Sequence, residues 1–402
     1  MTTIPIGERG AKSRRADGPL SAGFRPFFLL ASVWSALAVP LWLCTYSAKV
    51  SLPSALPLGT WHVHEMIFGF AFATIAGFML TAIPNWTGRL PIRGAPLGAL
   101  ATLWLAGRGA VLFSGATGAM PAAIIDLAFP MAFMAVVCRE LVAGRNWRNL
   151  PMLVALSLLF AGSLLVHLQA VGIAQTASLG NRLGMATVLL LIALVGGRIV
   201  PSFTRNWLMK ARPDGRLPAQ AGRLDMVALL VTVAGLAAWV AVPDSAAAPW
   251  LELAAGAAAA LRLSRWCGLA TLREPLVFIL HMGYGWLALG LLLLGFNGLH
   301  PLLPETTALH ALTAGAIGTM TLAVMTRATL GHTGRALVAD RGTVVIYLLV
   351  TAAALLRLAA PLAGAQSLVL TWVAGGAWSA AFGLFAVLYG SRLFREQDKA
   401  RV

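Results

Sequence analysis

Two histidines, a carboxylate and a thioether lie within five residues of one another at the start of a long apolar run. They are His62, His64, Glu65 and Met66, and residues 67–83 behind them carry no charge. Such a run is typical of a membrane-spanning helix, and polar groups at its mouth are costly to desolvate. Because imidazole and thioether bind soft metals and haem iron, the cluster indicates a metal or haem site.

The spacing of these four residues leaves two arrangements open. In a helix, His62, Glu65 and Met66 lie at i, i+3 and i+4 on one face, while His64 points about 200° away. One imidazole then faces the centre of a bundle and the other serves a different site. If residues 61–64 are extended, side chains two apart share a side and both imidazoles can face one metal.

The composition indicates the class of protein in which this motif lies. The chain has 402 residues, of which 59% are hydrophobic and 11% charged, and its mean hydropathy is +0.80. Soluble domains carry roughly 25% charged residues, so we predict an all-α polytopic membrane protein with about twelve spans. The expected spans are 27–46, 61–83, 95–113, 121–138, 151–173, 181–200, 224–242, 249–267, 275–298, 308–328, 344–360 and 368–390.

The distribution of basic residues predicts the topology. The net charge is +16 and the pI about 11.3, but the basic residues gather in the N-terminal segment, in every second loop and in the C-terminal tail. By the positive-inside rule both termini are cytoplasmic, and no nucleic-acid partner is needed to explain the charge. The groups are Arg9, Lys12, Arg14, Arg15 and Arg25; Arg89 and Arg93; Arg139, Arg145 and Arg148; Arg205, Lys210, Arg212, Arg216 and Arg223; Arg273; Arg335 and Arg341; and Arg392, Arg395, Lys399 and Arg401.

No connection is long enough to fold as a soluble domain. The longest, residues 201–223, reads as a loop because of Pro213, Gly215 and Pro218. We therefore predict one membrane domain, 27–390, between cytoplasmic basic tails at 1–26 and 391–402. Spans two, six and ten end alike in Pro, Thr, Gly or Arg, which would suit three pseudo-repeats of four helices; ordinary helix stops at a membrane surface are the alternative.

This topology, together with the helical rise of about 1.5 Å per residue, gives the depth of each histidine in the membrane. Five of the seven histidines gather at the outer face: His62, His64, His167, His300 and His310. His281 lies roughly 15–20 Å deeper than His310, too far for both to bind one metal. The outer cluster is the predicted metal or haem site; the alternative is that each intramembrane histidine links helices by hydrogen bonds.

Other polar side chains are candidates for supporting roles at this site. Glu65 can be the hydrogen-bond partner of His62 or His64, as a metal-bound imidazole requires. Arg108 and Asp126 both lie toward the outer half and can pair. Arg357 is a candidate for a haem propionate, with a snorkelling side chain as the alternative.

Three blocks resemble the NnrS family. They are residues 61–70 (WHVHEMIFGF) with 77–89 (GFMLTAIPNWTGR), residues 310–320 (HALTAGAIGTM) continuing to 331–335 (GHTGR), and residues 281–286 (HMGYGW). The resemblance runs from about Gly23 to the final span. It implies a bacterial inner-membrane protein that contains haem and copper and is linked to denitrification and to nitric oxide tolerance.

The resemblance implies site residues as well, without settling the chemical activity. The motif histidines carried over are His62, His64, His281, His310 and His332, and Arg335 lies in the same motif as His332. Which of them bind haem and which copper does not follow. By analogy alone, haem–copper oxidases also have twelve helices in three arcs and hold a haem between histidines of helices two and ten. Spans six and seven here carry no histidine, so an oxidase-type binuclear centre is not expected.

Two functions follow from these observations. The first is a haem and copper protein that binds or redox-processes nitric oxide near the periplasmic face, with an electron donor that the sequence does not identify. Its haem lies between His310 and one of His62 and His64, with Arg357 nearby; its copper is bound by the other outer histidines, among them His167 and His300, and by Met66. The alternative is a transporter of a metal ion or a small nitrogen species, with the outer histidines as the entry site and His281 as a deeper one.

Overall fold

The computed structural model describes residues 18–212 and 214–394. Helices make up most of this part of the chain, and no β-strand occurs in it. The all-α polytopic fold predicted from the composition is therefore confirmed. Of the two predicted tails, residues 1–17 and 395–402 lie outside the described residues.

Eleven helical rods of the described chain are long and apolar enough to cross a membrane, and they match eleven of the predicted spans. The single-helix rods are α1 (Phe24–Tyr46), α4 (Ala95–Leu112), α6 (Ala119–Ala143), α10 (Arg223–Ala241) and α12 (Pro275–Leu299). Three rods begin or end in a short 3₁₀ turn: η2 (Trp147–Asn149) with α7 (Leu150–Ala170), α15 (Arg341–Ala359) with η6 (Ala360–Leu362), and η7 (Gly364–Gln366) with α16 (Ser367–Phe394).

The remaining three rods, which are predicted spans two, six and ten, each contain a π-helical segment. They are α2 (Leu58–His64), η1 (Glu65–Ala71) and α3 (Phe72–Thr87); α8 (Ala177–Leu191), η3 (Ile192–Gly196) and α9 (Gly197–Ala211); and α13 (Glu305–His310), η5 (Ala311–Ile317) and α14 (Gly318–His332). A π-turn inserts one extra residue, is rare, and is found mostly at functional sites. Its recurrence in every fourth span fits the predicted pseudo-repeat of four helices.

The predicted span at 249–267 corresponds to α11 (Ala248–Ser264), which has 17 residues. That is the short end of the range, roughly 17–25 residues, that crosses hydrocarbon. The predicted loop at 201–223 is wrong in its first half, because α9 continues to Ala211 with Pro201 in its first turns. The short helices α5 (Ser114–Thr117) and η4 (Gly268–Thr271) lie in connections.

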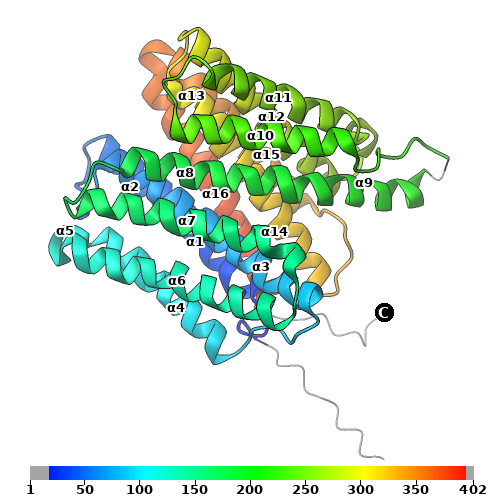
Figure 1. The fold of residues 1–402 in the computed structure, drawn as a ribbon, viewed down its shortest axis with the longest axis horizontal. Helices are drawn as coiled ribbons and strands as arrows, with labels where there is room; N and C mark the ends of the chain where they lie inside the picture. Colours follow the sequence, from blue (N-terminus) through cyan, green and yellow to red (C-terminus); the bar gives the residue numbers. More distant parts are fainter. Residues whose placement is uncertain (1–17, 213, 395–402) are drawn as a thin grey trace, which may run out of the picture.

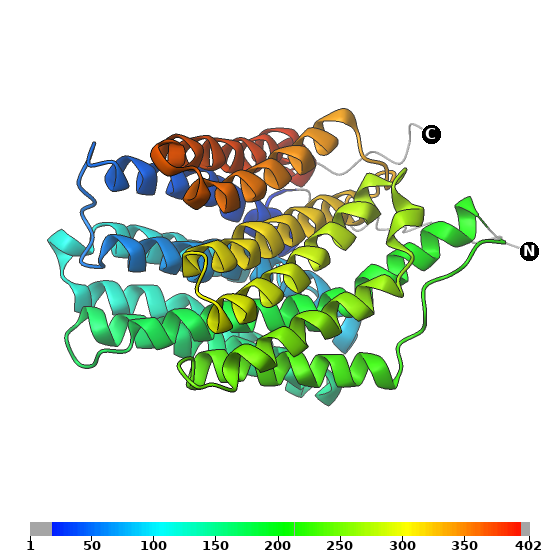
Figure 2. The ribbon, with the colours of Figure 1, turned by 90° about the horizontal axis from the view of Figure 1, so that it is seen from above.

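The rods with π-segments form an inner layer. In an 18-residue window of each, 72%, 61% and 67% of the residues are buried, against 33–44% in seven of the other rods; α12 matches the inner group at 67%. The long helices run along the long axis of the molecule, with α4 and α6 on one side and α10 and α11 on the other (Figures 1 and 2).

The two ends of the described chain meet at one end of the bundle. Arg25, at the start of α1, donates from Nη1 to the carbonyl oxygen of Leu393, at the end of α16, over 2.8 Å. The two helices lie side by side (Figure 2). We call this the terminal end, and the opposite one, which holds α2 and α13, the far end.

Close packing of α11 against α12 predicts a sensitivity to side-chain size. A Cβ on Gly256 of α11 would lie 2.7 Å from the backbone nitrogen of Leu292 and 2.9 Å from the carbonyl oxygen of Ala288. We expect Gly256→Val to lower the free energy of unfolding in detergent by about 1–3 kcal/mol, because the backbones must separate. Gly376→Val is the control, since a Cβ there meets nothing within 4 Å. Equal stability of the two variants would contradict this packing.

Candidate functional site

The two histidines of the opening motif point to different places. Both lie in α2, which is helical from Leu58, so the extended arrangement of residues 61–64 is wrong. The His62 ring stacks on Trp42 of α1, with ring centroids 4.6 Å apart. His64 is fully buried on the other side of the helix and bonds to Glu65 through Nδ1, at 3.1 Å from Oε1. Side chains two residues apart in a helix point in directions about 200° apart, so the two imidazoles belong to two different sites.

Glu65 and Met66 divide between these two sites. Met66 lines the same cavity as His62, as helical spacing predicts, whereas Glu65 is on the side of His64. Glu65 is the first residue of η1, and the wider π-turn advances by fewer degrees per residue, which keeps its carboxylate near the His64 face.

His62 faces His310 across a cavity of about 280 Å³ at the far end of the bundle. This volume lies near the lower end of the range for small-molecule and cofactor sites, roughly 300–1,000 Å³. Helices α1, α2, α13, α15 and α16 form most of its wall, and the lining is largely apolar. The apolar and aromatic part comprises Val39, Trp42, Leu43, Val63, Ile67, Phe70, Leu309, Ile317, Ala353 and Trp378.

The polar groups of this cavity are few and poorly satisfied. His310 Nδ1 lies 2.5 Å from the carbonyl oxygen of Thr306, to which it donates, so its Nε2 carries the free lone pair. His62 Nδ1 and Trp42 Nε1 are buried without a hydrogen-bond partner. Arg357, which lines the cavity, has no hydrogen bond or ion pair within the described residues. Buried polar atoms normally have partners, so His62 Nδ1 and Trp42 Nε1 indicate that the cavity binds a ligand, and the half-buried guanidinium of Arg357 is available to it.

These residues fit a haem. A metal-bound imidazole usually donates its other ring N–H to a carbonyl or carboxylate, as His310 does. A haem would offer iron to the imidazole nitrogens of His62 and His310, an apolar macrocycle to the aromatic wall and carboxylates to the guanidinium of Arg357. Gly375 also lines the cavity, and a Cβ there would lie 2.4 Å from Leu43 Cδ1, so the wall has no room for a larger side chain.

A second site lies on the opposite face of α2, where buried charges form a network. The Arg108 guanidinium of α4 bridges two carboxylates: Nη1 donates to Glu65 Oε2 over 2.7 Å, and Nη2 donates to Asp126 Oδ1 of α6. The pair predicted between Arg108 and Asp126 is therefore confirmed. All three side chains are nearly inaccessible to solvent.

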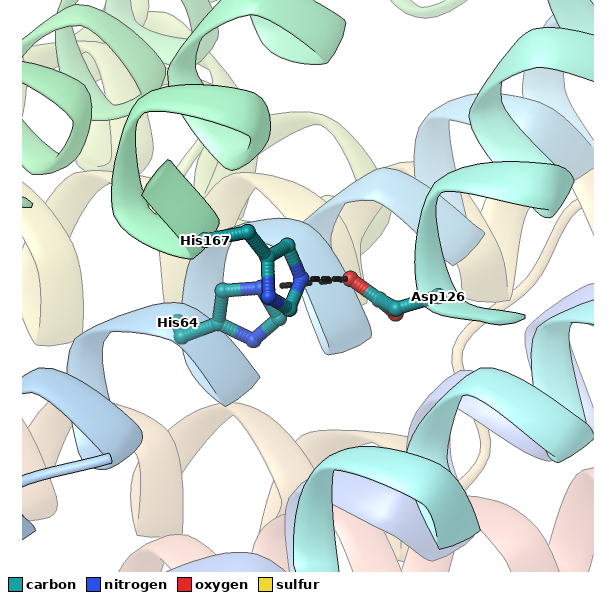
Figure 3. Close-up of side chains that lie close together, drawn as sticks. All are labelled: His64, Asp126 and His167. Carbon is teal, nitrogen blue, oxygen red and sulfur yellow. Dashed lines mark hydrogen bonds and ion pairs between the residues drawn. The ribbon is translucent and has the colours of Figure 1, made fainter. Parts of the chain in front are cut away.

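Asp126 also joins two histidines (Figure 3). Its Oδ2 lies 2.9 Å from His167 Nε2 of α7 and 3.3 Å from His64 Nε2. The Ser163 hydroxyl lies 3.4 Å from both Asp126 Oδ2 and His64 Nε2. Within the described residues, His64, Asp126 and His167 are the one group of three that could hold a metal ion.

The geometry of this trio fits a metal ion. Metal–ligand bonds of about 2 Å in a tetrahedral site place neighbouring ligand atoms roughly 3.3 Å apart, close to the observed separations. Glu65 would hold Nδ1 of His64 as a metal-bound imidazole requires. The charges agree, because two carboxylates and one guanidinium leave a net charge of −1 that a proton or a metal cation must balance.

The network depends on a close approach at Gly69 in η1. A Cβ there would lie 2.9 Å from Arg108 Nη1 and 3.0 Å from Glu65 Oε2. The carbonyl oxygen of Gly69 accepts a hydrogen bond from Trp104 Nε1 over 3.1 Å. The π-segment thus leaves room for the guanidinium and helps to orient the helix that carries it.

The remaining predicted residues lie outside both sites. His300 is exposed beside Phe296, and exposed His332 lies against the Phe24 ring near half-buried Arg335 at the terminal end. His281 is buried in α12, with Nε2 2.8 Å from the Thr204 hydroxyl. His281 belongs neither to the cavity lining of His62 and His310 nor to the group of His64, Asp126 and His167.

Asp126 and Ser163 were not anticipated as neighbours of the histidines. Asp126 was predicted only as the partner of Arg108. One signal was available: a carboxylate in an apolar span requires a cationic or donor partner, and His167 has a similar depth. The approach of α6 and α7 to α2 is a property of the tertiary structure, which the spacing of residues does not contain.

A model of the family described as NnrS protein matches residues 19–397, nearly the whole chain. A search of curated proteins found no match.

The bridging role of Arg108 predicts a large effect on stability. We expect Arg108→Met to lower the free energy of unfolding by about 3–5 kcal/mol, because Glu65 and Asp126 remain buried without their cation. Arg89→Met is the control: its side chain is 43% exposed and its partner Glu140 retains Arg139 at 2.8 Å. We expect less than about 1 kcal/mol there. Unfolding in detergent measures both, and a small loss for Arg108→Met would refute the bridge.

Proposed function

The chain belongs to the NnrS family, and on this premise we propose that it is a haem and copper protein that binds or redox-processes nitric oxide or a related small nitrogen species. Family membership supports in general a membrane protein related to the nitric oxide response. The main observation in support of haem is the cavity between His62 and His310, in which two imidazoles and an unpaired arginine meet an apolar wall.

His62 and His310 would hold the haem iron. The hydrogen bond from His310 Nδ1 to Thr306 fixes the tautomer that leaves Nε2 free for a metal. The Trp42 ring restricts the rotation of His62. Both ligands come from the first turns of inner rods that are largely buried in the bundle, and this packing helps to hold the two rings in place before the group binds.

The other cavity residues would orient the group and exclude water. Arg357 and the Nε1 of Trp42 are free to donate to carboxylates at the mouth of the cavity. Ile67, Phe70 and Trp378 form an apolar floor. When bound, haem supplies an iron centre that takes up electrons and binds small nitrogen oxides.

His64, Asp126 and His167 would bind copper. Three ligand atoms, a carboxylate behind His64 and a deficit of one positive charge support this assignment. Imidazole ligands suit copper, among other metals. Because His62 and His64 are two residues apart in α2, less than one helical turn separates the ligands of the two proposed metals.

We further propose that the protein lies in the bacterial inner membrane with both termini in the cytoplasm. The basic loops support this orientation through the positive-inside rule. The contact of Arg25 with Leu393 supports the same side for both ends of the described chain. The far end, with both metal-binding arrangements, would then face the periplasm, and electrons would come from a donor still to be found.

The haem assignment predicts a spectroscopic difference between two histidine variants. We expect purified protein from haem-replete cells to show a Soret band, and His310→Ala to lose it because one iron ligand is missing. His281→Ala is the control and should keep the band, since His281 bonds to Thr204 outside the cavity. A Soret band retained at full intensity in His310→Ala would refute the assignment of His310 as an iron ligand. A colourless wild-type protein that transports a metal ion into proteoliposomes would favour the transporter.

The copper assignment predicts that a variant of the second site loses copper and keeps haem. We expect His167→Ala to lose copper in metal analysis and to retain the Soret band, because it removes a ligand from the second site alone. His300→Ala, whose imidazole is exposed, should retain both metals. Copper retained in His167→Ala, or haem and copper lost together, would contradict two separate sites.

A further inference from the structure

A second cavity, of about 90 Å³, lies between the three inner rods. We call it the axial cavity. Its wall comes from α3, from α8 with η3 and α9, and from α14, together with Met152 of α7. These include both rods that carry the proposed haem ligands His62 and His310.

The axial cavity lies next to the histidine cavity, on its terminal side. On each inner rod the two linings follow one another within one helical turn. Phe70 lines the first cavity and Ala71 the second. Along α8 and the third inner rod the corresponding neighbours are Met185 with Val188 and Ile317 with Met320. The axial cavity is therefore the direct neighbour of the histidine cavity along the inner rods.

The lining offers almost nothing to water. Its two hydroxyl groups already have acceptors: Thr74 lies 3.3 Å from the carbonyl oxygen of Phe70 and 3.7 Å from Met325 Sδ, and Thr321 donates to the carbonyl oxygen of Gly318 over 2.9 Å. The other lining residues are apolar, among them Met79, Met152 and Met320. A buried water needs two to four polar partners, and apolar cavities of about 150 Å³ stay dry and bind xenon or benzene.

We propose that the axial cavity binds a small apolar gas molecule, of the size of a diatomic, and holds it beside the histidine cavity. The cavity is too small for a macrocycle and too apolar for an anion or a metal ion. Small apolar molecules concentrate in hydrocarbon, which surrounds the bundle, and move from there into apolar cavities. That the gas is nitric oxide rests on the proposed function; the binding of an apolar gas does not.

Xenon tests the proposal because it is apolar, is of similar size and needs no haem. We expect xenon-pressurised crystals of the full chain to show one xenon atom between Ala71, Val188 and Met320. The same experiment on His310→Ala should give the same atom, since that variant changes only the neighbouring cavity. Haem loss together with retained xenon therefore separates the two claims.

Variants of Gly196 measure the occupancy of the axial cavity. A Cβ on Gly196, which lines the axial cavity, would meet Tyr284 at 3.4 Å and Met320 at 3.6 Å, ordinary contact distances, so a methyl group fits there. We expect xenon occupancy to fall stepwise in Gly196→Ala and Gly196→Val. Gly285→Ala and Gly285→Val are matched controls in α12, because their Cβ would meet only Leu263, at 3.6 Å. If Gly196→Val does not fold, Val188→Phe fills the same cavity from α8.

Three results would overturn the proposal: no xenon in the axial cavity of the wild type, equal occupancy in the Gly196 and Gly285 variants, or electron density for water or an acyl chain in its place. If the wild type binds xenon there but shows no Soret band, the gas site stands and the proposed haem function fails.

Discussion

The turn of helix α2 places His62 and His64 on opposite sides of one rod, and the far half of the bundle is built on this separation. On one side α1, α13, α15 and α16 enclose the cavity of His62 and His310. On the other side α4, α6 and α7 bring Arg108, Asp126 and His167 to His64. A helix cannot direct side chains two residues apart to one point, so the motif serves two sites.

The second constraint is the cost of burying carboxylates away from water. Glu65 and Asp126 are both nearly inaccessible, and a single guanidinium between them leaves one negative charge to be balanced. A buried charge is retained only with a partner, so α2, α4, α6 and α7 are bound together by this network. The π-segment η1 contributes by keeping Glu65 on the His64 face and by leaving room for Arg108 at Gly69.

The π-segments also connect the inner rods to both cavities. They recur in α2–η1–α3, α8–η3–α9 and α13–η5–α14, the rods that lie deepest in the bundle together with α12. Helices with an added residue per turn present their side chains in a new register. The histidine cavity lies at the far ends of these rods and the axial cavity lies between their middle parts. The separation of a polar site from an adjoining apolar one thus follows from the same three helices.

The sequence by itself determined the apolar spans, the shared end of the two termini, the exclusion of His281 from the outer site and the resemblance to NnrS. These follow from hydropathy, charge and helical rise, which are local properties. Only the tertiary structure decided that His62 faces His310, that Glu65 turns to His64, and that Asp126 joins His64 to His167. Contacts between helices far apart in the chain depend on how the rods pack and on where π-turns rotate them, because each inserted residue turns the side chains that follow it by about 100°.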